Sequence, residues 1–472
     1  MGVATYAQAG QNCGTTLLWA LLLLLLLVPV LVVAREVVAR LGAVTGVAHA
    51  RLIRERFGRF WQAFLVGDLF VLNFLTLVTE FIGVDLGLSY FGVFPDVSVP
   101  LAAVGLFAMA ATGSFRRWER FMFVFILTSL LMFPLAALAH PRLGPVVAGT
   151  VVPRVTGGFD ATAVLFIIAI VGTTVAPWQL FFQQSNVVDK RITTRVLRCE
   201  LADTVIGAVL TNVGAAALIV ATAFAFARSH LAGHFASALA VAQGLAGRVL
   251  PLAGDLFAVI LVNAAILGAS AVTLSTSYAL GDSFGMKDSL HRKVTDAKAF
   301  YASFAALVAL AAGIVLIPGA PLGLMTGVQV LAGVLLPSAI VFLLLLCNDA
   351  AVLGPWVNTT RQNVVASLIV AVLVLLSLIL TITTVFPAIA FGPLVASLAA
   401  LGAVGLGVLG LSARRRRDGR RATERSDAIR ARLATWRMPP LALLAPPVWS
   451  ASASSGCWRF GRTWSSRWCC SP

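Results

Sequence analysis

Long apolar runs recur along the whole chain and constrain its fold more than any other feature. Eleven can be read from the sequence, at 16–33, 60–88, 100–112, 121–139, 161–182, 202–227, 250–280, 300–317, 324–346, 364–386 and 391–411. Most are long enough to cross about 30 Å of hydrocarbon as an α-helix. A content of 59% hydrophobic and 11% charged residues also excludes an ordinary soluble globule. We therefore expect an all-α polytopic membrane protein.

The first ten residues are also apolar, but they carry no charged region of the kind that opens a signal peptide. They are typical of the second half of a helix. With this truncated first helix, the expected number of transmembrane helices is about twelve.

Basic residues indicate the orientation of these helices. They cluster in alternate loops, at 35–59, 116–120, 190–198, 287–298, 361 and 414–417, whereas the opposite loops hold only Arg142, Arg154, Arg228 and Arg248. Cytoplasmic loops are the ones enriched in Lys and Arg, so both termini are expected in the cytoplasm. The net charge of +16 is therefore explained by the basic residues of the cytoplasmic loops, and nucleic acid is not an expected partner. A composition rich in Ala, Val, Leu, Gly and Arg is typical of a GC-rich bacterial genome, which predicts the bacterial inner membrane.

Three regions follow from these patterns. Residues 1–411 form the predicted transmembrane domain, 412–437 a basic cytoplasmic segment, and 438–472 a disordered or frameshifted tail. The run of four Arg at 414–417 either binds anionic lipid headgroups or serves only as an orienting flank. Six scattered Cys do not form a disulfide framework.

The stretch at 172–179, GTTVAPWQ, lies inside an apolar run and weakens the helix that its neighbours favour. Backbone groups freed at membrane depth are tolerated where they line a polar cavity, and there they coordinate cations or orient substrates. The alternative is a proline kink relieved by the Thr hydroxyls. The sequence alone leaves both interpretations open.

Ionisable side chains inside apolar spans are candidates for function. Asp68 and Glu80 lie in the span 60–88, and Asp68, Thr76 and Thr79 are spaced so as to form one wetted helix face. Each carboxylate is either a gate or part of an ion path, or a buried group hydrogen-bonded to a neighbouring helix.

Two further polar features have structural alternatives. A hydroxyl-rich stripe at 263–277 favours close helix packing. Gln329, a lone amide in an apolar span, is either a helix-to-helix hydrogen bond or an oxygen ligand. The chain has no nucleotide-binding loop, no catalytic Ser/His/Asp arrangement and no His spacing typical of a metal site, so neither an enzyme nor a bound cofactor is expected.

Three motifs carry a resemblance to a known family. The runs TVAPWQLFFQQS at 174–185, VATYAQAG at 3–10 and TEFIG at 79–83 resemble the Nramp family of divalent-metal transporters over residues 2–411. The resemblance implies a leucine-transporter-type fold: two inverted five-helix repeats followed by two C-terminal helices. Helices one and six of such a fold are broken at a metal site near the membrane midplane.

The resemblance also implies a metal-binding set and a path. The metal set comprises Gly2, Thr173, Thr174, Ala176, Gln179 and Gln329, and the gate or ion path comprises Asp68, Glu80, Pro177 and Trp178. Backbone carbonyls supply the oxygens at 173–176. Gly2 would be the remnant of a helix-one motif whose Asp is the main anionic ligand in the family.

The chain departs from the family pattern in ways that bear on selectivity. Ala176 stands where the family has a metal-binding Met, and Trp178 where it has a His. Thioethers select softer metals, whereas Mg²⁺ prefers oxygen and retains several waters. The chain is therefore more similar to the Nramp-related magnesium transporters, and Mg²⁺, with Mn²⁺ second, is the expected substrate.

A third departure concerns coupling, because Leu77 stands where proton-coupled members have an Asp. This favours transport driven by the metal gradient and the membrane potential. The alternatives are a proton-coupled Mn²⁺/Fe²⁺ transporter, an organic-solute carrier of the same fold, and a truncated membrane protein without a working site.

Overall fold

The computed structural model describes residues 2–382, apart from 22–27, 156–157, 159–160, 175, 193–196, 228, 287–288, 318–323, 360–361, 365, 369, 372–373, 376–377 and 379–381. Within these residues every regular element is helical. Six helical stretches are long and apolar enough to cross a membrane. The prediction of an all-α polytopic membrane protein is therefore confirmed.

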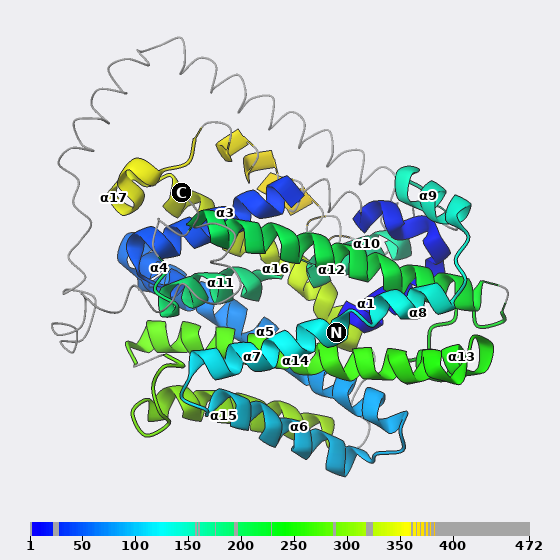
Figure 1. Ribbon diagram of the computed structural model, residues 1–472. Coiled ribbons are helices and arrows are strands. Elements are labelled where there is room, and N and C mark those ends of the chain that lie inside the picture. Colours follow the sequence, from blue (N-terminus) through cyan, green and yellow to red (C-terminus); the bar gives the residue numbers. More distant parts are fainter. Residues whose placement is uncertain are drawn as a thin grey trace, which may run out of the picture.

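The helices follow one another in the order shown in Figure 1. Their bounds are α1 Gly2–Cys13, the 3-10 helix η1 Gly14–Leu17, α3 Val28–Thr45, α4 His49–Phe57, α5 Arg59–Ser89, α6 Pro95–Ala110, α7 Phe115–Ser129, α8 Met132–Leu138, α9 Leu143–Val151, α10 Ala161–Thr174, α11 Pro177–Asp189, α12 Leu197–Phe226, α13 Ala238–Arg248, α14 Pro251–Phe284, α15 Lys298–Val315, α16 Leu324–Cys347, α17 Ala350–Leu353 and the 3-10 helix η2 Gly354–Trp356.

The expected spans coincide with most of the long helices, with three differences in detail. The span expected at 16–33 overlaps α3 only from Val28, and α3 continues to Thr45, so the first residues of the basic loop expected at 35–59 are helical. The span expected at 161–182 consists of two helices, α10 and α11, and the span expected at 121–139 begins earlier, at Phe115. The short helices α4, α9 and α13 lie between spans and were not predicted. The two expected C-terminal spans fall largely outside the described residues, as do the segments 412–437 and 438–472.

Helix α14 is the longest element, with 34 residues and a length of about 51 Å. Pro251 occupies its first turn, where a missing N–H costs no helical hydrogen bond. Gly285 ends it in the left-handed conformation (φ 65°), which an L side chain rarely adopts. This length exceeds the hydrocarbon core, so the ends of α14 extend beyond it.

Helix α1 lies between the two long helices α12 and α14. In Figure 1, α12 and α14 run across the molecule in similar directions, with α1 between them and with α6 and α15 forming an outer layer on the side of α14. Helix α14 packs against α5, α1 packs against α12, and α10 packs against α16. Large aromatic side chains fill the core, and Phe81, Phe257, Phe300 and Phe304 are fully buried.

The outer helices present apolar side chains outward. Of an apolar stretch of 18 residues within Phe115–Leu138, only 11% is buried, against 67% of the corresponding stretch within Arg59–Ser89. Phe123, Val124 and Leu127 of α7 are exposed. Such a surface is stable only in hydrocarbon, so α7 lies at the lipid boundary.

Candidate metal site at the helix break

The chain is broken between α10 and α11. Helix α10 ends at Thr174 and α11 begins at Pro177, while Ala176 is extended with φ −101° and ψ 149°. Proline at the first position of a helix lacks only an N–H that has no helical partner there. The predicted interruption of the span is therefore confirmed, and two half-helix ends face each other with opposite partial charges.

Helix α1 begins beside this break. A Cβ atom built on Gly2 would lie 3.3 Å from Cγ2 of Thr173, so the start of α1 is in contact with the last turn of α10. The Tyr6 hydroxyl lies 2.8 Å from Oγ1 of Thr174. The structure thus brings together the predicted helix-one and helix-six residues, although they are about 170 positions apart.

The side chain of Thr174 already has structural partners. Its hydroxyl donates to the Ile170 carbonyl at 2.7 Å, so the hydrogen bond with Tyr6 uses the Thr174 oxygen as acceptor. These two bonds fix the end of α10 and attach it to α1. What Thr174 has left to offer a cation is the second lone pair of its hydroxyl oxygen and its backbone carbonyl.

Ala176 lies in a small apolar cluster. Its side chain is buried and packs with Leu72 of α5 and with Val328 and Ala332 of α16. Its carbonyl accepts from the Gln179 N–H at 3.1 Å in the first turn of α11. A carbonyl oxygen has two lone pairs, so this bond leaves one for a ligand.

Trp178 is positioned through its backbone and its ring. Its carbonyl accepts a hydrogen bond from Oγ of Ser275 at 3.0 Å, which ties the first turn of α11 to α14. Its side chain is partly buried and packs against the apolar cluster around Ala176 and against two larger groups of buried apolar side chains. Pro177 beside it is buried. The two residues therefore line the packed side of the break, and a gating role for them remains a prediction.

The two predicted glutamine ligands are placed differently. Gln179 is half-buried in the first turn of α11. Gln329 follows Val328 in α16, the helix that packs on Ala176, and its side chain lies outside what the structure describes. Their roles as ligands remain predictions.

The carboxylates of α5 lie on either side of the break. Leu72, which contacts Ala176, is one turn after Asp68 and eight residues, about 12 Å, before Glu80. Asp68 is half-buried and accepts from Oγ of Ser338 at 3.0 Å. Glu80 is buried, and its carboxylate lies directly against Gly268 of α14. The two groups therefore flank the break and do not form one site.

The expected wetted face of α5 is not present. Thr76 and Thr79 are both buried, and they donate to carbonyls of their own helix, at Leu72 and Thr76 respectively. The prediction was wrong because both threonines are packed inside the helix bundle, where α5 is in contact with α14 and several other helices. Small hydroxyl side chains in membrane helices satisfy themselves in this way when they are packed against a neighbour.

The hydroxyl stripe of α14 holds helices together. Ser270 accepts from Trp118 of α7 at 2.9 Å, Thr276 accepts from Asn73 of α5 at 2.8 Å, and Asn263 donates to the Phe125 carbonyl at 2.9 Å. These bonds support the packing interpretation.

Histidine does not contribute to the site in the described part of the chain. His49 begins α4, and its Nδ1 lies 2.9 Å from Oε1 of Gln184. The Nε2 of the same Gln184 side chain donates to the Val47 carbonyl. Burial lowers the pKa of His49 to about 4, while the hydrogen bond to Gln184 opposes this shift. His49 is therefore neutral at pH 7. Across the described residues no three His, Cys, Asp or Glu side chains are grouped as metal ligands.

Sequence reasoning missed three residues that position the site. They are Tyr6, Ser275 and Gly268, which contact Thr174, Trp178 and Glu80 across the helix bundle. Ser275 lies in the stripe that the sequence shows, but its partner cannot be inferred from spacing. Gly268 has no signal in the sequence, since a glycine in a membrane helix is common.

The amino-acid sequence matches the model of a known transporter family. The family model described as natural resistance-associated macrophage protein-like, Nramp, matches residues 2–383. This chain belongs to the Nramp family. It is therefore a divalent-metal transporter and not an enzyme, and the metal is its transported substrate rather than a cofactor.

Curated relatives and solved structures agree with this assignment. The divalent metal cation transporter MntH of Ralstonia nicotianae is 29% identical over 385 residues, covering 78% of this chain and 84% of that protein. MntH of Verminephrobacter eiseniae is 32% identical over 209 residues, covering 42% of this chain and 44% of that protein. The fold is similar to that in a crystal structure of a mutant of the Eremococcus coleocola manganese transporter, with a TM-score of 0.61 at 20% identity, covering 88% of this chain and 91% of that one. The expected leucine-transporter-type fold class is thereby confirmed.

Proposed function

We propose that this Nramp protein carries Mg²⁺, and with lower preference Mn²⁺, across the bacterial inner membrane by alternating access. The observation that carries the proposal is Ala176 at the helix break. Its methyl group is packed against Leu72, Val328 and Ala332, so no sulfur ligand stands at this position. Carbonyl oxygens of 173–176, with Gln179 and Gln329, then supply hard ligands to a cation that retains part of its hydration. Gly2 at the start of α1 lies beside this set.

The driving force that we propose is the metal gradient together with the membrane potential, which is worth about 2.3 kcal/mol per charge at 100 mV. Leu77 supports this proposal, because it is fully buried and apolar where proton-coupled members of the family have an Asp. Pro177 and Trp178 would form the hinge and the packed wall of the break. Asp68 and Glu80, on either side of it, would line the entry and exit of the ion. We place both termini in the cytoplasm, on the evidence of the basic loops.

Replacing Ala176 by Met tests the selectivity argument. Adding a thioether should raise Mn²⁺ uptake relative to Mg²⁺ uptake, because the softer metal gains a ligand that Mg²⁺ does not use. Uptake of the two ions by reconstituted protein, measured separately and in competition, gives the ratio. Overfilling the cluster around Ala176 should cost about 1–3 kcal/mol of stability.

Ala176→Leu is the matched control, since it adds a similar volume without sulfur. It should lower the uptake of both ions alike. If Ala176→Met and Ala176→Leu give the same ratio as the parent protein, the selectivity argument fails.

The second candidate is a proton-coupled Mn²⁺ carrier. The relatives with solved structures are named as manganese transporters, and the buried carboxylate of Glu80 is a possible proton carrier. Metal-driven acidification inside proteoliposomes would support it, whereas the first proposal predicts none. The same vesicles report Mg²⁺ uptake, so the two candidates are distinguished in one preparation.

A further inference from the structure

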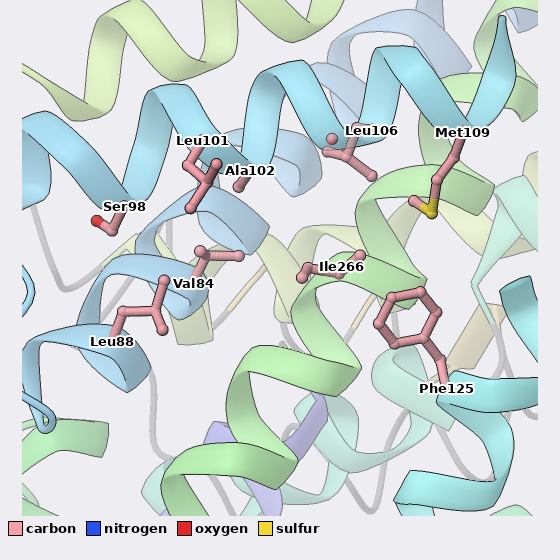
Figure 2. Close-up of a pocket in the computed structure, with 10 residues that line it drawn as sticks. Val84, Leu88, Ser98, Leu101, Ala102, Leu106, Met109, Phe125 and Ile266 are labelled. Carbon is pink, nitrogen blue, oxygen red and sulfur yellow. The ribbon is translucent and has the colours of Figure 1, made fainter.

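An apolar cavity that is partly open to the surface lies between four helices, away from the helix break. Its volume is about 210 Å³, and its walls come from α5, α6, α7 and α14. Figure 2 shows Val84 and Leu88 of α5 on one side, Leu101 and Met109 of α6 on another, and Phe125 and Ile266 toward one end. The cavity follows α6 from Leu101 to Met109, eight residues further along the helix and a distance of about 12 Å. We call it the α6 slot.

The chemistry of the α6 slot is that of a hydrocarbon site. The single hydroxyl in its lining belongs to Ser98, which donates to Oδ1 of Asp85 at 3.0 Å. The other lining side chains are apolar, and a water molecule there would lack the two or more polar partners that it needs. An occupant of this slot must therefore be apolar.

The slot lies at the lipid boundary. Leu101 and Val104 of α6 are about two-thirds exposed, at 65% and 67%, and most of α7 faces outward. Leu88 lies at the end of α5 that is remote from the basic segment 51–59, so this end belongs to the outer leaflet in the proposed orientation. Bilayer acyl chains are the apolar material present at this surface.

We propose that the α6 slot binds one acyl chain of a phospholipid from the outer leaflet. The chain lies along α6, with its outer part near Leu88 and Leu101 and its deeper part near Met109, Phe125 and Ile266. Burial of methylene groups against these side chains, together with dispersion contacts that a void would lack, stabilises the bound chain. The lipid thus fills the seam between α6–α7 and α5–α14. This inference depends on the orientation for the leaflet, and it is independent of which metal is carried.

Gly105 makes the slot testable. It lines the slot, is exposed, and has open space where a Cβ would be placed, with no atom within 4 Å. Gly105→Leu should therefore fill the slot without disturbing the helices. Gly207→Leu on α12 is the matched control, because Gly207 is also an exposed helical glycine with no atom within 4 Å of an added Cβ.

The measurement uses the full chain in nanodiscs that contain a phospholipid with a photoreactive diazirine in one acyl chain. After irradiation, mass spectrometry locates the adducts. We expect them to be concentrated at Met109, Phe125 and Ile266, to fall several-fold in Gly105→Leu, and to stay unchanged in Gly207→Leu. Melting curves of the two variants should match that of the parent protein.

Two results would overturn the proposal. One is an even distribution of adducts over the exposed faces of α6, α7 and α12, or a yield that Gly105→Leu does not lower. The other is the recovery, by native mass spectrometry, of an apolar molecule other than phospholipid that Gly105→Leu displaces.

Discussion

The carboxylate of Glu80 on α5 is packed directly against Gly268 of α14. A Cβ added at Gly268 would lie 2.4 Å from Oε1 of Glu80 and 2.7 Å from its Cδ. No rotation of the new methyl group avoids this clash, so either the carboxylate or the helix must move. Gly268 is thus required for the position of Glu80.

Gly268→Ala should destabilise the protein by about 1–3 kcal/mol and reduce transport, because Glu80 is displaced. Thermal melting and metal uptake measure the two effects. Gly313→Ala on α15 is the control, since an added Cβ there meets no atom within 4 Å, and it should be neutral or slightly stabilising. In a protein that already carries Glu80→Ala, the loss of stability caused by Gly268→Ala should largely disappear. A cost that persists there would mean that the glycine serves helix packing rather than Glu80.

At the scale of elements, α11 is held at both of its ends. It begins at the break with Pro177 and ends at Asp189, whose carboxylate accepts from the Tyr278 hydroxyl at 2.7 Å, the Ser289 hydroxyl at 2.6 Å and the Leu290 N–H at 3.2 Å. These bonds join the end of α11 to α14 and to the loop after α14. A half-helix that starts at the proposed metal site is therefore attached to α14 at its other end.

Asp189→Ala should loosen this attachment and leave donors without an acceptor, at a cost of about 2–3 kcal/mol. Tyr278→Phe removes only one of the three bonds, so it should cost about 1 kcal/mol. Limited proteolysis after residue 285 reports release of the loop, and melting curves report stability. If the two variants lose the same free energy of unfolding, the carboxylate does not act as a shared acceptor.

The sequence predicts elements well where a local signal is strong. The break at 175–176 follows from Gly172, two Thr and Pro177, and the long apolar runs define α5, α12 and α14. The short helices α4, α9 and α13 escape prediction, because a few turns between spans give no length signal. The wetted face on α5 was wrong for a similar reason: helical spacing shows which residues share a face, but not which helix covers it.

The same limit applies to the candidate site. The sequence motifs point to Thr173, Thr174 and Ala176, and the structure places them with Gly2 at the meeting of two half-helices. Tyr6, Ser275 and Gly268 act across distances of about 90 to 190 positions in the chain, which no periodicity encodes. Positioning residues of this kind become visible only when the helices are packed.

For the whole molecule, the proposed orientation can be tested through Cys199. It lies in the first turn of α12, after the basic residues Lys190 and Arg191, and is partly exposed, whereas Cys13 and Cys347 are buried. We expect a membrane-impermeant maleimide to label Cys199 only from the cytoplasmic side, in a variant with Cys457, Cys469 and Cys470 replaced by Ser. Ala236→Cys, in the exposed loop before α13, should react from the opposite side. Labelling of both positions from the same side would refute the orientation.

The unequal surroundings of α7 and α14 have a consequence for how such a protein can change over generations. The exposed side of α7 faces hydrocarbon, so one apolar side chain can replace another on that side without affecting a neighbour. Helix α14 forms hydrogen bonds or close contacts with α5, α7 and α11, and a change in it must satisfy several partners at once. Inherited variation should therefore accumulate on the lipid-facing helices, while α14 changes mainly through paired substitutions.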